Sequence, residues 1–361
     1  MSTHKAIALE EPSVPLTVIT LPTPTLSATQ ILVRTSLVSM TPLSAHQIDH
    51  NLLTAPFPFI PGGNLVGTVV ARGSDSIRPE LHIGAKVFSY SFGPREGKAC
   101  QELVVVEQSR AAVIPMGVTD LEAVAVPDSF VSAWHSLNVD LGIPLAGSSD
   151  PTTAVPQPPA NAHKPVLIWG GATSVGRFAL QILHRHGFTD ITTTASLRHF
   201  DELLALGASR VFDYADPNVS SKIGMPQLVL DCIGDEARTL PFYSTVVAHH
   251  ATVAVLLPVR MRDGSISVTV PTEFASGVTV RPVHAQRYEK YPGAEDLQPS
   301  IMPRWLKEGW IKACRTRWLR ATGAAGVEEA LHEFRAGTVK NEKLVMKMVL
   351  GGACAENAPA R

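Results

Sequence analysis

The sequence predicts an α/β protein with two domains, a barrel of short β-strands followed by a doubly wound parallel sheet. Three observations predict this class. Residues 1 to about 125 hold short β-prone runs separated by proline and glycine, which is typical of a barrel. From residue 165 on, apolar runs alternate with amphipathic ones, which is typical of parallel strands covered by helices. The length of 361 residues exceeds what one core usually organises, so two domains are expected.

The barrel region and the segment after it can be divided into elements. Five runs are expected to be strands: Thr17–Leu21, Gln30–Ser39, Gly67–Arg72, Lys86–Ser91 and Glu102–Val106. Residues 120–141 look helical. The tract 147–162 carries four prolines and almost no large apolar residue, so we expect an exposed loop there rather than a domain boundary.

The stretch 165–176, PVLIWGGATSVG, is the most informative part of the chain. Its apolar run predicts a buried strand, its two glycines a sharp turn, and the segment from Gly176 an amphipathic helix. A strand, a glycine turn and a helix N-terminus form a phosphate cradle, because free N–H groups and the positive end of the helix dipole face the anion. The spacing nearly satisfies the dinucleotide fingerprint GxGxxG, with Thr173 in place of the middle glycine. The residues expected to bind the cofactor here are Gly170, Gly171, Thr173, Ser174, Val175 and Gly176.

Thr173 leaves two outcomes open. The middle glycine lets the backbone approach a pyrophosphate, and a β-branched residue would crowd that approach. Alternatively, the hydroxyl of Thr173 itself bonds the phosphate.

Further strands and helices continue the pattern. Strands are expected at 190–195, 211–214, 228–234, 252–257 and 343–349, and helices at 201–207, 299–312 and 326–336. Ligands of doubly wound sheets bind beyond the carboxyl ends of the strands. Ser196, Tyr214 and the residues Cys232, Ile233 and Gly234 fall at such ends, so we expect them to line the cofactor. The tail 351–361 is small and polar and is expected to be disordered.

The end of the second strand indicates which cofactor is used. Ser196 lies 20 positions after Gly176, where a cofactor with a free ribose 2′-OH usually meets Asp or Glu. Here the chain reads Ser196-Leu-Arg198-His199, without an acid. A hydroxyl and a guanidinium suit a 2′-phosphate, so the sequence predicts NADP(H) rather than NAD(H). The alternative is that Arg198 is a solvated residue at a helix start.

Composition excludes several classes of protein. Charged residues make up 17% and the net charge is −1, so nothing indicates nucleic-acid binding. The four cysteines form no C-x-x-C pair, which fits a reducing compartment without disulfides. No apolar run approaches 18 residues and no cleavable signal segment is present. We therefore expect a cytoplasmic protein that does not bind membranes.

Several segments carry a resemblance to a known family: PGGNLVGTV at 61–69, GKACQEL at 97–103, SAWHSL at 132–137, LGASRVFDY at 206–214 and LDCIG at 230–234. From residue 5 to residue 349, the chain resembles the medium-chain dehydrogenase/reductases, in the zinc-independent quinone oxidoreductase and enoyl reductase branch. The proline-rich tract and the run from Ser196 to Phe200 are most similar to fungal stand-alone oxidoreductases. These include trans-acting enoyl reductases that serve iterative polyketide synthases.

The resemblance implies an architecture. A GroES-like barrel, residues 1–125, would be completed by residues 286–350. A Rossmann domain would comprise residues 126–285.

The resemblance also implies a reaction without metal. Zinc-binding relatives use a cysteine and a Gly-His-Glu motif, and this chain has Thr41 and Gly62-Gly63-Asn64 there. With three or four ligands required, no metal site is expected. The pair His46 and His50 could seed one, but a polar helix face or a pocket lining is the expected role. The implied reaction is hydride transfer from NADPH to the β-carbon of an enone or enoyl thioester, followed by protonation of the α-carbon.

Candidate catalytic residues follow from the same alignment. In the stretch that matches the family's N-P-x-D-x-(K/Y/W), Thr41 and Ser44 replace the Asn and Asp, and His46 stands at the last position. His46 is a candidate proton donor, with a structural role as the alternative. Tyr90 lines the pocket or fills the barrel.

Three further residues are assigned to the cofactor by the resemblance. Ser132 would bond the nicotinamide ribose and Tyr214 the adenosine phosphate. Lys343 would lie near the cofactor, with a solvated lysine before an edge strand as the alternative.

Three functions remain open from the sequence. The first is an NADPH-dependent enoyl or enone reductase, acting on a small or carrier-tethered substrate, in the latter case with a polyketide synthase. The second is a stand-alone quinone reductase. The third is a non-redox member of the fold that binds a protein or catalyses a cofactor-independent step. The sequence leaves open whether the protein is a monomer or a homodimer.

Overall fold

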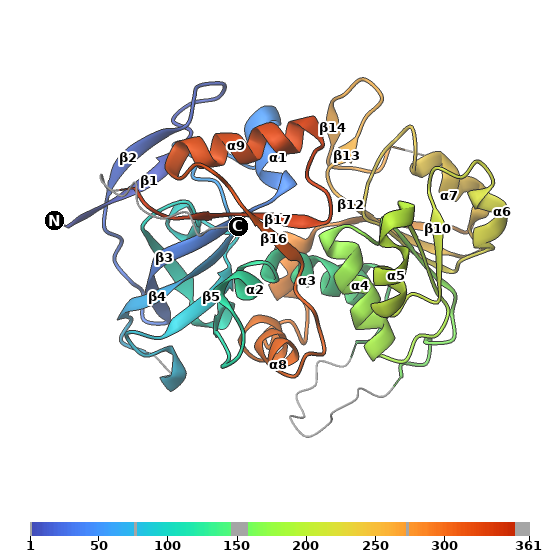
Figure 1. Ribbon diagram of the computed structural model, residues 1–361, viewed down its shortest axis with the longest axis horizontal. Helices are drawn as coiled ribbons and strands as arrows, with labels where there is room; N and C mark the ends of the chain where they lie inside the picture. Colours follow the sequence, from blue (N-terminus) through green and yellow to red (C-terminus); the bar gives the residue numbers. More distant parts are fainter. Residues whose placement is uncertain (1, 76–77, 146–157, 272–273, 351–361) are drawn as a thin grey trace.

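A computed structural model describes residues 2–75, 78–145, 158–271 and 274–350. The chain forms a β-barrel region and a parallel α/β region that lie side by side (Figure 1). The fold class is therefore α/β, with a β-barrel region and a doubly wound parallel sheet, as predicted. The tail 351–361 and most of the proline-rich tract lie outside the described residues.

The barrel region is built on a seven-stranded sheet. Its path is β16-β17-β3-β4-β5-β7, with β6 also paired to β3. The bounds are β3 Gln30–Met40, β4 Asn64–Arg72, β5 Lys86–Tyr90, β6 Leu103–Glu107, β7 Ala111–Val113, β16 Arg315–Trp318 and β17 Glu342–Lys347. Strands β1 (Thr3–Ala8) and β2 (Thr17–Pro22) form an antiparallel ribbon. The five strands expected from the sequence in this region are all present.

The second sheet is parallel throughout, in the order β10-β9-β8-β11-β12-β15. The bounds are β8 Val166–Trp169, β9 Ile191–Ala195, β10 Arg210–Asp213, β11 Leu228–Asp231, β12 Thr252–Leu256 and β15 Thr279–Val283. The two apolar central strands, β8 and β11, are buried along their full lengths. Strand order reverses between them, and such a switch point is where doubly wound sheets bind ligands.

Helices surround the two sheets. The bounds are α1 Pro42–His50, α2 Asp120–Val124, α3 Pro127–His135, α4 Ser174–Arg185, α5 Phe200–Ala205, α6 Val219–Ile223, α7 Leu240–Val246, α8 Met302–Lys307 and α9 Gly323–Ala336. The longest, α9, has 14 residues, and within the described ranges no helix combines the length and apolar character of a membrane span.

An aromatic cluster fastens α3 between the two regions. The Phe130 ring of α3 makes edge contacts with Phe178 of α4 at 5.7 Å and with Trp305 of α8 at 5.8 Å. All three side chains are fully or almost fully buried. Edge-to-face pairs of buried rings stabilise beyond their area alone, so α3 is held rigidly beside the nucleotide-binding sheet.

The C-terminal segment returns to the barrel (Figure 1). Strand β17 pairs antiparallel with β3 and parallel with β16. Helix α9 packs on α1, where Arg335 forms a bidentate contact with Asp49. Residues from both ends of the sequence therefore build the same barrel.

One expectation about this last segment was wrong in detail. The helix expected at 299–312 is a π-turn, Leu297–Ile301, followed by the short helix α8. It ends near Gly309, whose φ of +67° only glycine adopts easily. Strands β15 and β16 were not predicted, because neither shows a long apolar or alternating run.

Candidate cofactor and active site

The turn after β8 has the geometry of a phosphate cradle. Gly170 has a φ of +85°, which reverses the chain directly after the strand. The Gly171 N–H donates to the Thr194 carbonyl at 3.0 Å, and a Cβ on Gly171 would lie 2.1 Å from Thr193 Oγ1. Only glycine fits there, so the loop passes tightly over β9.

Thr173 is the N-cap residue of α4. Its hydroxyl accepts a hydrogen bond from the Gly176 N–H at 3.0 Å, as expected of a capping threonine. A Cβ on Gly176 would lie 2.5 Å from the Gly170 carbonyl oxygen, so helix and turn are in close contact. Within the described chain, the N–H groups of Ser174 and Val175 have no acceptor. Two free donors at the start of a 12-residue helix fit a pyrophosphate.

The ends of β9 and β10 bring three predicted residues to one edge. Ser196 Oγ and Tyr214 OH lie 3.1 Å apart, both open to solvent. The Tyr214 side chain is 54% exposed. Arg198 is exposed beside them, and its Nε donates to His199 Nε2 at 3.0 Å. Hydroxyl, phenol and guanidinium donors thus gather where an adenosine phosphate would lie in a Rossmann sheet.

A buried carboxylate shapes the turn after β11. Asp231 is fully buried, and its Oδ1 accepts hydrogen bonds from the Ile233 and Gly234 N–H groups at 2.9 and 3.1 Å. Thr239 Oγ1 donates to the other oxygen at 2.5 Å. Burial raises the pKa of Asp231 above its ordinary value, although these donors oppose the rise. The carboxylate holds Cys232, Ile233 and Gly234 in place, a role that sequence reasoning did not assign.

Ile233 covers the glycine turn. Its side chain is 46% exposed, and its Cδ1 would lie 3.0 Å from a Cβ on Gly170. The ends of β8 and β11 therefore meet. An exposed apolar side chain next to free backbone donors suits a ligand with both a phosphate and an apolar part.

Lys343 is buried in an ion pair with the start of α3. Its Nζ contacts both oxygens of Asp128 at 2.7 and 2.9 Å and Ser129 Oγ at 2.8 Å. It is only 4% exposed, and β17 is paired on both sides. The alternative of a solvated lysine before an edge strand is therefore wrong. All three N–H bonds of the ammonium are directed to protein oxygens.

Asn64 connects this ion pair to the barrel. Its Oδ1 accepts a hydrogen bond from the Asp128 N–H at 3.0 Å, near the start of α3, and its Nδ2 donates to Ser39 Oγ at 3.1 Å. The residue is fully buried. Ser132 lies one turn further along α3 and is half-buried.

Tyr90 belongs to the core between the regions. It is 7% exposed, and its ring carbons lie 3.0 Å from the place of a Cβ on Gly63. Gln298 bonds both backbone groups of Tyr90, at 2.8 and 3.1 Å. Burial, and next the Asp128 charge, raise the pKa of Tyr90 far above its ordinary value. The phenol therefore stays protonated and can only donate or accept a hydrogen bond.

His46 and Thr41 belong to α1 at the barrel side. Thr41 is the N-cap residue, without a capping bond from its side chain. The His46 ring stacks on His50 at 6.1 Å. Burial lowers the pKa of His46, and the charges of His50 and of Arg260 in the nucleotide-binding region lower it further. His46 is therefore mostly neutral at pH 7.

The predicted site residues thus form two groups. The glycine turn, Ser196, Arg198, Tyr214 and the 232–234 turn share the carboxyl edge of the parallel sheet. His46, Thr41, Tyr90 and Lys343 come from the barrel region, and among the described residues no hydrogen bond or ion pair joins them to that edge. In the part of the chain that the structure describes, no three His, Cys, Asp or Glu side chains gather as metal ligands would.

Comparisons with known proteins agree with this architecture. Residues 27–133 match the alcohol dehydrogenase GroES-like domain family. The dehydrogenase orsE of Emericella nidulans is 29% identical over 359 residues, which cover 96% of this chain and 100% of that protein. The quinone oxidoreductase of Coxiella burnetii has a TM-score of 0.71 at 20% identity, over 96% of this chain and 99% of that one. At this identity the likeness concerns the fold alone.

Another relative has a slightly higher sequence identity over a shorter stretch. The trans-enoyl reductase tazE of Aspergillus terreus is 30% identical over 227 residues, which cover 61% of this chain and 71% of that protein. Together with the barrel and the Rossmann sheet described above, this similarity means that the chain belongs to the medium-chain dehydrogenase/reductase family.

Proposed function

We propose that the protein is an NADPH-dependent reductase of activated C=C bonds, of the enoyl thioester or enone type. The observation that carries the proposal is the carboxyl edge of the parallel sheet, where a glycine turn with two free N–H donors stands beside Ser196, Arg198 and Tyr214. Relatives named trans-enoyl reductase, such as tazE, support the choice of reaction.

The cofactor would be held by the chain's own donors. The turn 170–176 would bind the pyrophosphate through the N–H groups of Ser174 and Val175, and Ser132 the nicotinamide ribose. Ser196, Arg198 and Tyr214 would bind the 2′-phosphate, with the turn 232–234 beside the cofactor. When bound, the cofactor supplies a hydride. The Lys343 ammonium contacts Asp128 and Ser129, so we propose a structural role for Lys343 rather than contact with the cofactor.

The barrel side would orient the substrate carbonyl. A reduced enone carries negative charge on oxygen, which a hydrogen-bond donor must stabilise. His46 is mostly neutral at pH 7, since its pKa is lowered, so it can donate a hydrogen bond more readily than a proton. If protonated His46 delivers the proton, activity should fall as the pH rises above its lowered pKa. Thr41, the N-cap residue of the same helix, and Tyr90 would complete this side of the site.

The proposal is tested by pairing cofactors and substrates. Oxidation of NADPH and NADH is followed at 340 nm with a crotonyl thioester and with a simple quinone. We expect NADPH oxidation with the thioester. Inertness toward thioesters together with turnover of quinones would favour a quinone reductase. Absence of NADPH binding in a fluorescence titration would favour a non-redox member of the fold.

A partner and a compartment are part of the proposal. We infer that the natural substrate is tethered to a carrier domain of a polyketide synthase, as the resemblance to trans-acting enoyl reductases implies; the relative tazE is named a trans-enoyl reductase. A carrier-bound crotonyl group should then give a higher kcat/KM than the free thioester. The described cysteines Cys100, Cys232 and Cys314 are all free thiols, which suits the reducing cytoplasm.

A further inference from the structure

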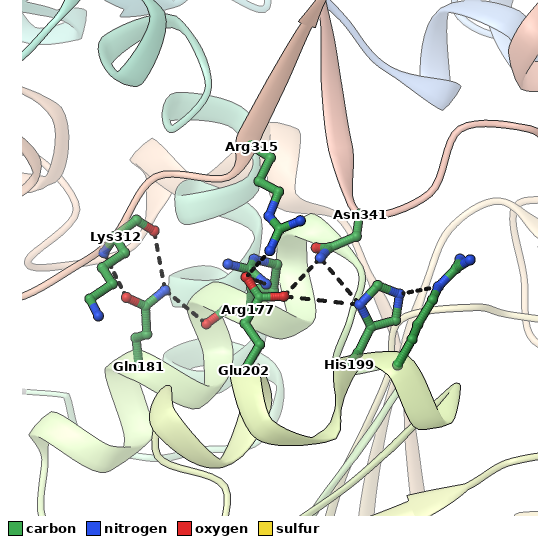
Figure 2. A network of polar contacts seen from close by, with 8 residues as sticks. Arg177, Gln181, His199, Glu202, Lys312, Arg315 and Asn341 are labelled. Atoms are coloured by element: carbon green, nitrogen blue, oxygen red, sulfur yellow. Dashed lines mark hydrogen bonds and ion pairs between the residues drawn. The ribbon is translucent and has the colours of Figure 1, made fainter.

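A network of charged side chains lies behind the ends of β9 and β10. It joins α4 and α5 to the C-terminal segment, which Figure 2 shows approaching from the other side. Glu202 is its one carboxylate among the described contacts. The cations around it are Arg177 of α4, Arg315 of β16 and, at the edge, Arg198. His199 and Asn341 complete the network.

Glu202 is fully engaged by residues other than Arg198. Its Oε1 faces Arg177 at 2.9 Å and Arg315 at 3.8 Å. Its Oε2 accepts a hydrogen bond from Asn341 Nδ2 at 3.0 Å and lies 4.0 Å from His199 Nδ1. These contacts lower the pKa of Glu202 despite its partial burial, so it stays ionised.

Arg198 consequently has no counterion among the described residues. Its one described contact is the hydrogen bond from Nε to His199 Nε2. Because the Arg198 guanidinium can only donate, His199 Nε2 must be unprotonated in this geometry and the ring neutral. Glu202 Oε2, at 4.0 Å from His199 Nδ1, is too far to accept a hydrogen bond from it. Arg198 and His199 can both be cationic, and in this arrangement only Arg198 carries a charge.

We propose that His199 is a second ligand of the 2′-phosphate, neutral and bonded to Arg198 in the free protein and protonated toward the phosphate in the complex. The proposal rests on the NADP(H) binding proposed above and adds a residue and a proton to it. A dianion placed beside Arg198 supplies the missing counterion. It also removes the reason for His199 to remain neutral, because Arg198 turns from the ring to the phosphate.

The charges around His199 fix the direction of the effect. In the free protein burial, and next Arg198, lower the pKa of His199; Arg177 and Arg315 act the same way and Glu202 opposes them. The phosphate dianion must raise it. Between the two pKa values, binding takes up a proton, so affinity is greatest at low pH and falls as the pH rises through the pKa of the complex. The second pKa of a phosphate is near 6, so at pH 7.5 its own titration contributes little.

The experiment uses 2′,5′-ADP, which carries the phosphate without the nicotinamide, and 5′-AMP, which lacks it. Calorimetric titration of the full chain at pH 7.5 in HEPES and in Tris gives the protons exchanged from the two enthalpies. We expect the wild type to take up a measurable fraction of one proton with 2′,5′-ADP and none with 5′-AMP. Between the pKa values of the free and bound protein, the affinity for 2′,5′-ADP should then fall as the pH rises, by at most about tenfold per pH unit.

The variant His199→Gln keeps an acceptor for Arg198 but cannot be protonated. It should lose both the uptake and the pH dependence, and bind 2′,5′-ADP several-fold more weakly. His82→Asn, a change at an exposed barrel loop, should behave like the wild type. Thermal unfolding of both variants reports whether they fold.

Three results overturn the inference in distinguishable ways. If 2′,5′-ADP binds the wild type without proton uptake, or if the uptake persists in His199→Gln, His199 is not a ligand of the phosphate. The proposed binding of NADP(H) would be unaffected by that result. Equal affinity for 2′,5′-ADP and 5′-AMP removes the phosphate site. Binding of neither compound removes the proposed cofactor as well.

Discussion

The edge formed by β9 and β10 and the junction of α3 with β17 each hold a basic residue that the sequence comparison with the family assigned to the cofactor. At the junction, Lys343 is buried and all its N–H bonds meet Asp128 and Ser129. At the edge, Arg198 is exposed, and among the described residues its one contact is a neutral imidazole. A buried cation without a partner would strongly destabilise the fold, so the burial of Lys343 requires its pairing with Asp128. An exposed cation is solvated by water and does not need a counterion. The comparison teaches that the unpaired cation is the better candidate for binding an anion.

The largest expected effect is at the junction. Lys343→Met leaves the Asp128 charge without its partner, so the free energy of unfolding should fall by about 3 kcal/mol, measured by urea denaturation. Asp128→Asn combined with Lys343→Met should recover part of the loss. Lys86→Met breaks an exposed pair with Asp120 and should change stability by less than about 1 kcal/mol. The comparison would be wrong if Lys343→Met kept its stability but lost NADPH affinity.

The next effect is at the edge. Arg198→Ala should weaken NADPH binding by about 10- to 100-fold, because one or two charge-assisted hydrogen bonds are lost, and leave NADH binding and stability unchanged. Fluorescence titration measures both cofactors. Arg210→Ala is the matched control, since Arg210 pairs with Asp190 at the opposite end of β10. A variant that bound NADPH as well as the wild type would assign Arg198 to the solvated surface.

A smaller effect sharpens the description of the edge. Tyr214→Phe removes the phenol that lies 3.1 Å from Ser196 Oγ. Loss of one hydrogen bond worth about 1 kcal/mol should weaken NADPH binding about fivefold. Ser196→Ala should act similarly, and the double variant should show less than additive loss if both hydroxyls bind the same phosphate. Additive losses would place them on separate groups.

The smallest effect concerns the turn shared by both cofactors. Thr173→Gly restores the middle glycine of the fingerprint and removes the cap on Gly176 N–H. Glycine is a fair N-cap, so stability should fall by only a few tenths of a kcal/mol. NADPH affinity should stay within about twofold, because the hydroxyl faces the helix rather than the phosphate. A marked gain in affinity would show that Thr173 crowds the pyrophosphate.

The sequence by itself determined the parallel sheet and its ligand edge. Local patterns carry that information: buried apolar strands, a glycine turn, a capped helix and polar residues at strand ends. Gly170, Ser196 and Tyr214 could be placed because the carboxyl ends of parallel strands meet at one edge whatever the rest of the fold.

Only the tertiary structure decided which charged residues form ion pairs with one another. Lys343 and Asp128 are separated by 215 positions, and Asn341 and Glu202 by 139, so no local pattern could pair them. Likewise β15 and β16 are strands because neighbours complete them, not because their own residues alternate. Ion-pair partners and strand partners depend on contacts between residues that are distant in the sequence. An unpaired cation such as Arg198 is identified only when the partners of the charged residues around it are known.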